Sequence, residues 1–190
     1  MKKVLILLLM IGSLLMWGCA AAEESATPEE EAPAEEAAQE GEMGEEDSMR
    51  GTAQVTLAGK NITIEYGRPT LQGRDMIAQL EVGAPWRLGM NTATTLDTEA
   101  ALTFGGATVD PGHYRLWAMK TSETEWVLIV SSSMEEFDEA SEVARIPLTQ
   151  GENAQPVEQF TIALEGTGDN SGTFTATWDT LKLSADFTAE

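Results

Sequence analysis

Three arginines gather in one irregular stretch of the sequence, where they could bind a small ligand. Arg68, Arg74 and Arg87 lie between positions 67 and 91, and the same stretch supplies Trp86 and Asn91. A guanidinium group donates paired hydrogen bonds to a carboxylate, a phosphate or sugar hydroxyls, and an indole ring offers a flat face for stacking. These five residues predict a loop pocket for a small anionic or carbohydrate ligand.

The same arginines have a structural alternative. From position 51 onward the chain carries twenty acids and eight bases, a net charge of −12, so each arginine could pair with a carboxylate and pin the loop. On residue types alone we favour this interpretation, and the ligand pocket stays open as the functional hypothesis.

Catalytic chemistry has little support in the sequence. The only histidine, His113, follows a Pro-Gly turn and could act as a general base, because imidazole titrates near neutral pH. No nucleophile elbow, zinc-protease motif, phosphate loop or EF-hand loop occurs, and one His and one Cys are too few for a structural zinc site. We therefore expect no cofactor and no metal, and a binding or interaction domain rather than an enzyme. The alternatives are a hydrolase of envelope or extracellular carbohydrate using His113 and Arg87, and a structural subunit of an envelope assembly.

The elements that must position these residues are short β-strands. Ile62, Ile64 and Tyr66 alternate after a turn at 58–61, and 126–130 is a continuous apolar run. About nine such segments, separated by Gly, Pro, Asn and Asp turns, predict an all-β domain, an antiparallel β-sandwich or a jelly-roll-like barrel. Only 75–80 and 134–143 look helical, the second behind a Ser133 cap.

The tryptophans of this domain differ in their expected positions. Trp126 and Trp178 alternate with apolar residues and are expected in the core. Trp117 lies on the strand face opposite Leu116, so its exposure is the one to test.

The first residues of the chain have the pattern of an export signal. Lys2 and Lys3 precede an apolar run over 4–16, which is shorter than the roughly 20 residues that span a bilayer. The only cysteine, Cys19, follows Gly18 and resembles the lipidated cysteine of bacterial lipoproteins. This predicts a signal peptide over 1–18 and a palmitate-bearing membrane anchor at Cys19. Ala20, in place of Asp, favours an outer-membrane lipoprotein of the cell envelope, on either its periplasmic or its surface-exposed side. The plainer alternative is an ordinary secretory signal with a chance cysteine.

A linker is expected between this anchor and the domain. Residues 20–50 carry twelve acids and one base, with no aromatic residue. Such a segment cannot bury enough surface to offset its chain entropy, so 19–50 is predicted to be a disordered acidic tether leading to a domain over 51–190. The net charge of −21 also argues against a nucleic-acid partner, and the oligomeric state cannot be read from the sequence.

Several sequence motifs of the domain are recognisable together. They are the stretch at 64–69, the stretch at 86–95, the turn at 111–116 and the loop at 169–171. In order and spacing they resemble the bacterial family called domain of unknown function 2911, whose members are typically exported, often as lipoproteins. The resemblance implies no activity that could be carried over. Gly67 stands where this family often has Ser.

Overall fold

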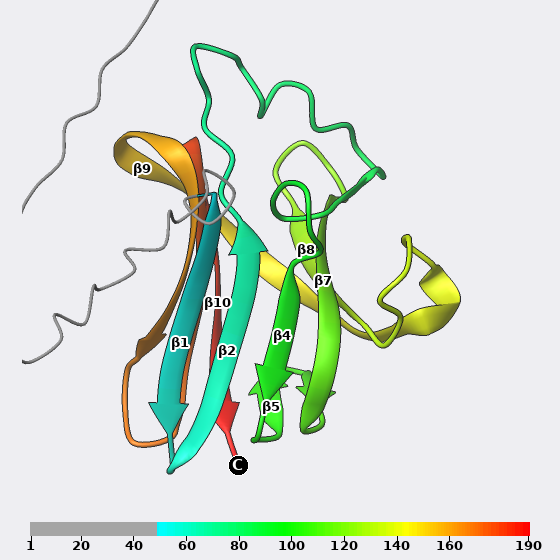
Figure 1. Cartoon of the computed structure of the whole chain (residues 1–190), viewed down its shortest axis with the longest axis vertical. Helices are drawn as coiled ribbons and strands as arrows, with labels where there is room; N and C mark the ends of the chain where they lie inside the picture. The colour runs from blue at the N-terminus through cyan, green and yellow to red at the C-terminus, as the bar shows by residue number, and fades with distance from the viewer. Residues whose placement is uncertain (1–48) are drawn as a thin grey trace, which may run out of the picture. The chain divides into compact units, whose positions relative to one another are not determined.

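Strands make up almost every element of the domain (Figure 1), in agreement with the all-β prediction. The computed structural model describes residues 49–190, so the predicted signal, Cys19 and nearly all of the acidic tether lie outside the described residues. The strands are β1 (Arg50–Leu57), β2 (Lys60–Gly67), β3 (Pro85–Trp86), β4 (Thr95–Thr98), β5 (Leu102–Phe104), β6 (Ala107–Val109), β7 (Gly112–Lys120), β8 (Trp126–Ser131), β9 (Glu142–Gly166) and β10 (Ser171–Ala189).

The strands form one antiparallel sheet that folds back on itself in two layers (Figure 1). The order is β1-β2-β4-β7-β8-β9-β10-β5-β6, and the short β3 pairs with β7 off this path. The 25-residue β9 makes the passage between layers, because residues 142–148 pair with β8 while residues from 149 onward pair with β10. The register between β9 and β10 shifts around Asp179, and a shift of this kind bends a strand.

The core lies between the two layers and follows the alternation of the sequence. Ile62, Ile64 and Tyr66 point inward from β2, and Trp126 and Trp178 are buried as predicted. An aromatic cluster occupies one part of this core. Trp86 stacks on Trp178 with a 6.0 Å separation of ring centroids, and the edge of Phe160 meets both rings.

A second, smaller apolar cluster lies on the outer face of β7 and β8. It contains Trp117, Met119 and Ile129, which are covered by residues 132–141, hereafter called the flap. Phe137 of the flap meets the edge of Trp117 at a centroid distance of 5.6 Å. Trp117 is therefore 4% exposed. The face opposite Leu116 is not solvated at this point, because the flap covers it.

Arg115 fastens the flap to the sheet. Its guanidinium group is buried and donates hydrogen bonds to the carbonyl oxygens of Met134, at 2.7 Å, and Glu135. The same group lies 4.3 Å from the ring centroid of Trp117, which is a cation–π contact. These bonds take flap carbonyls that a helix would have used internally.

The two helices expected from the sequence do not form. Within 134–143 only a single 3-10 turn appears, Glu139–Ser141, and its cap is Asp138 rather than Ser133. Residues 75–80 form turns, in which the Asp75 carboxylate accepts from the Ala78 N–H at 2.9 Å. Both predictions were wrong because Asp side chains cap short turns in the two segments, at Asp75 and Asp138, and because Arg115 takes the carbonyls of Met134 and Glu135. No helix within residues 49–190 has the length and apolar character of a membrane span.

Candidate functional site

The irregular stretch between β2 and β4 is held in place by close packing at its two ends. A Cβ atom on Gly67 would overlap the backbone of Met90, so glycine lets the end of the loop lie directly on its beginning. The Thr94 hydroxyl donates to the Leu88 carbonyl at 2.7 Å, and Leu88 is fully buried. The loop is therefore a fixed part of the domain surface.

The middle of this loop is bonded to strands on either side. The Leu71 N–H donates to the Glu158 carbonyl, and the Phe160 N–H donates to the Pro69 carbonyl. Further along, β3 pairs with β7, so that Trp86 lies opposite Ala118. The loop thus spans from β9 to β7, and its arginines are distributed over that distance.

Two of the predicted arginines meet in one pocket, hereafter the arginine pocket. Its volume is about 330 Å³, within the range of small-molecule sites. The residues that line it are Met49, Arg68, Pro69, Thr70, Gln72, Arg74, Met90 and Gln159. No carboxylate of residues 49–190 lines the pocket, although this domain is acidic overall.

Arg68 enters this pocket from the end of β2. Its stem runs over Gly51, where a Cβ atom would come within 2.6 Å of the Arg68 Cδ. The Nε of Arg68 is buried, and within residues 49–190 it has no hydrogen-bond partner. Arg68 itself lines the pocket, where its positive charge favours an anionic ligand.

Arg74 faces the same pocket because of a tight turn. Gln72 and Gly73 both have positive φ angles, of 50° and 74°, and the Arg74 N–H donates to the Leu71 carbonyl. The Arg74 guanidinium folds back to donate to the carbonyls of Leu71, at 3.1 Å, and Thr70, at 3.2 Å. It is oriented by neutral oxygens, and no carboxylate of the described residues forms an ion pair with it.

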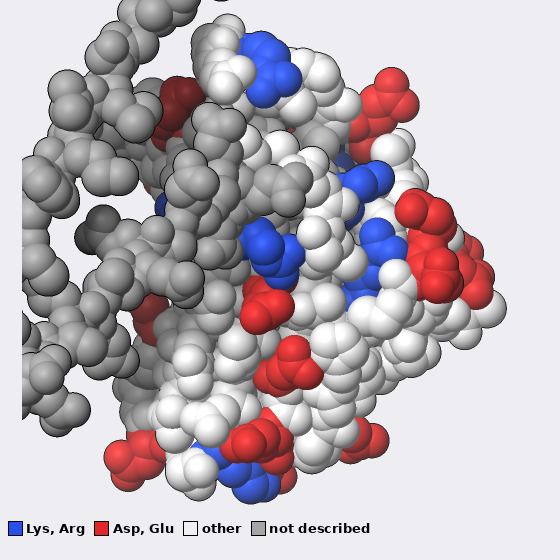
Figure 2. All heavy atoms as spheres, viewed as in Figure 1, with Lys and Arg blue, Asp and Glu red and all other residues white. Residues whose placement is uncertain are grey.

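Carboxylates do not neutralise these arginines within the part of the chain that the structure describes. The ion pairs found there join Arg50 to Glu65, His113 to Asp97, Lys120 to Glu123 and Arg145 to Glu142. The carboxylate of Glu158, which borders this region, accepts from the backbone N–H of Gln72 at 2.8 Å. In Figure 2, most of the basic side chains on the visible face lie in the half of the domain that contains the β2–β4 loop.

The other predicted site residues do not join this pocket. Trp86 and Arg87 line a second depression of about 250 Å³, together with residues 79–81, 84 and 85. Trp86 is half-buried against the core aromatics, and Arg87 is exposed. Asn91 is exposed with a φ of 59° and lines neither depression. Gln159 was not anticipated, because its position on β9 gives no sign in the sequence that it faces Arg68.

His113 lies away from all of these residues. It is on β7 opposite Asp97 of β4, and its Nδ1 is 2.6 Å from an Asp97 carboxylate oxygen, with both side chains about half exposed. Trp86 is opposite Ala118, five residues along β7 from His113, which corresponds to about 17 Å at roughly 3.3 Å per residue. His113 and Arg87 therefore do not form one site.

Comparison with known proteins identifies the family to which this domain is similar. The sequence profile of a protein family of unknown function, DUF2911, matches residues 48–187. The chain belongs to the DUF2911 family. The resemblance seen in the sequence is thereby confirmed, and the match covers all the strands described above except the last two residues of β10. No curated protein and no solved structure matches the chain.

Proposed function

We propose that this protein is a lipid-anchored envelope protein whose β-domain binds a small oxyanion in the arginine pocket. The observation that carries the proposal is that Arg68 and Arg74 converge in one pocket in which no carboxylate of residues 49–190 neutralises them. In an acidic domain, two such guanidinium groups attract the one kind of ligand that the rest of the surface repels.

The geometry of the pocket supports a compact ligand with carboxylate or phosphate oxygens. Arg68 lines the pocket with its Nε buried, while Arg74 is already oriented by two backbone carbonyls. A preoriented guanidinium loses little side-chain entropy on binding. The amide groups of Gln72 and Gln159 offer further neutral donors or acceptors at the pocket wall.

Thermal-shift and calorimetric titrations with phosphate, citrate and glucuronate test this proposal. We expect at least one of these anions to stabilise the full chain, and Arg68→Ala and Arg74→Ala each to weaken its binding about tenfold, the usual cost of a charge-assisted hydrogen bond. Arg145→Ala is the matched control, because Arg145 is exposed and already paired with Glu142. If the two pocket variants bind as the control does, the arginines are structural.

The anchor is part of the same proposal and rests on Cys19. We expect Cys19→Ala to release the chain from membranes, because the acyl chains contribute about 0.8 kcal/mol per buried CH₂. Fractionation of cells that express each form, with carbonate washing, measures this. Unchanged membrane retention of Cys19→Ala would show that the chain is held in another way.

A further inference from the structure

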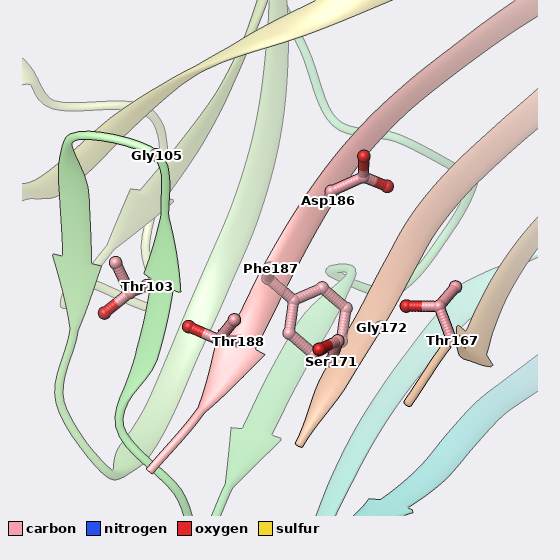
Figure 3. Close-up of a pocket in the computed structure, with 8 residues that line it drawn as sticks. All are labelled: Thr103, Gly105, Thr167, Ser171, Gly172, Asp186, Phe187 and Thr188. Atoms are coloured by element: carbon pink, nitrogen blue, oxygen red, sulfur yellow. The ribbon is translucent and has the colours of Figure 1, made fainter. Parts of the chain in front are cut away.

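Another surface pocket lies far along the sequence from the arginine pocket, and its chemistry is the opposite. Its volume is about 610 Å³, and it is open to solvent. Four hydroxyl side chains line it, those of Thr103, Thr167, Ser171 and Thr188, together with the carboxylate of Asp186 and no basic residue. We call it the hydroxyl groove (Figure 3).

The course of β10 creates this groove. Both ends of the strand line it, because the strand curves until Gly172, near its start, lies against Phe187, near its end. A Cβ atom on Gly172 would come within 2.7 Å of the Phe187 ring, so glycine is required for this contact. The Ala189 N–H then donates to the Asn170 carbonyl at 2.7 Å and fixes the two ends together. The groove is therefore shaped by the backbone and does not depend on flexible side chains.

The polar groups of the groove are placed by the strands and are largely unused. Thr188 is the direct cross-strand partner of Thr103, so their hydroxyls are neighbours on one side of the Phe187 ring in Figure 3. Asp186 accepts from the Thr173 hydroxyl at 2.6 Å through one oxygen, which leaves its second oxygen available. Within residues 49–190, no protein hydrogen bond engages the hydroxyls of Thr103, Thr167 or Thr188.

We propose that the hydroxyl groove binds a neutral saccharide. Hydroxyl groups both donate and accept, and a carboxylate accepts strongly, which matches the hydroxyls of a sugar ring. Asp186, without a basic neighbour, disfavours an anionic ligand. A metal ion is also disfavoured, because no cluster of three metal-ligating side chains occurs among the described residues. Phe187 is nearly buried and gives the floor little stacking surface, so we expect millimolar affinity.

Amide-resolved NMR titration of the full chain with cellobiose, maltose and diacetylchitobiose tests this inference. We expect saturable shifts at 171–173 and 186–188 with at least one of the sugars. Asp186→Ala should weaken binding about tenfold or more. Asp169→Ala removes an exposed acid from the neighbouring turn without touching the groove, and should bind as the wild type does.

Thr188→Val is a second variant, which keeps the shape of the side chain while removing its hydroxyl. It should likewise weaken sugar binding, so it tests the inference even if Asp186→Ala proves unstable. The absence of shifts at 171–188 with all three sugars at tens of millimolar would overturn the inference, and so would equal binding by Asp186→Ala and Asp169→Ala. The arginine pocket is independent of this groove, so Arg74→Ala should leave sugar binding unchanged.

Discussion

Arg115 and the pair Arg68–Arg74 show two uses of arginine in one acidic domain. None of the three meets a carboxylate within the described residues. Arg115 is closed in by the flap, with two flap carbonyls and the Trp117 ring as its partners. Arg68 and Arg74 instead line a pocket that is open to solvent. The lack of an ion pair therefore does not by itself mark a binding site; the open space beside the guanidinium does.

The largest effect is expected where arginine acts as a fastener. Arg115→Ala removes a buried stem and the bonds to the Met134 and Glu135 carbonyls, so we expect a loss of about 2–4 kcal/mol in the free energy of unfolding. Urea denaturation measures this. Arg115→Met keeps most of the stem and should lose less. If Arg115→Ala is as stable as the wild type, the flap is held by other contacts. The contrast between Arg115 and the pair Arg68–Arg74 would then fail.

An intermediate effect is expected on the flap itself. Phe137→Ala removes the partly buried ring that covers Trp117, and should cost about 1–3 kcal/mol. The exposed indole should also shift its fluorescence to longer wavelength and become accessible to acrylamide. Anion binding should not change, because the flap does not line the arginine pocket. A loss of anion affinity in Phe137→Ala would mean that the two regions are coupled.

The smallest effect is expected at Arg87. It is exposed and lines a different depression from that of Arg68, so Arg87→Ala should change stability by less than about 0.5 kcal/mol and leave anion affinity unchanged. Calorimetric titration of Arg87→Ala and of Arg74→Ala under the same conditions measures the anion affinity. An equal loss of anion affinity in both variants would support the single five-residue site that the sequence suggested.

The sequence predicted the strands well because their signal is local. Alternation at Ile62, Ile64 and Tyr66 describes a half-buried strand without reference to any other segment. The flap was misread as a helix for the opposite reason. Its conformation depends on Arg115, about twenty residues earlier and on another strand, and no local pattern records that bond.

The candidate site was predicted in part. The arginines of the loop were identified from their type. Their division between two pockets depends on the turn at Gln72–Gly73 and on pairing with β9 and β7. The turn is local, but its positive φ angles leave no periodic signal, and the pairings with β9 and β7 are long-range contacts. The hydroxyl groove was missed because Thr and Ser on the outer positions of a strand are also what an ordinary solvated face contains. Only the curvature of β10 brings Ser171 and Thr188 to one place.

The central claim is that Arg68 and Arg74 bind an anion while Arg115 does not, and the side-chain Nε–H resonances of arginine test it most directly. The full chain, labelled with ¹⁵N, would be titrated with the anion that gives the largest thermal shift, and the Arg68, Arg74 and Arg115 resonances assigned by substitution. We predict that the Arg68 and Arg74 resonances shift saturably because both residues line the pocket, while the Arg115 resonance stays in place. Shifts of equal size at all three arginines, or none at Arg68 and Arg74, would contradict the account.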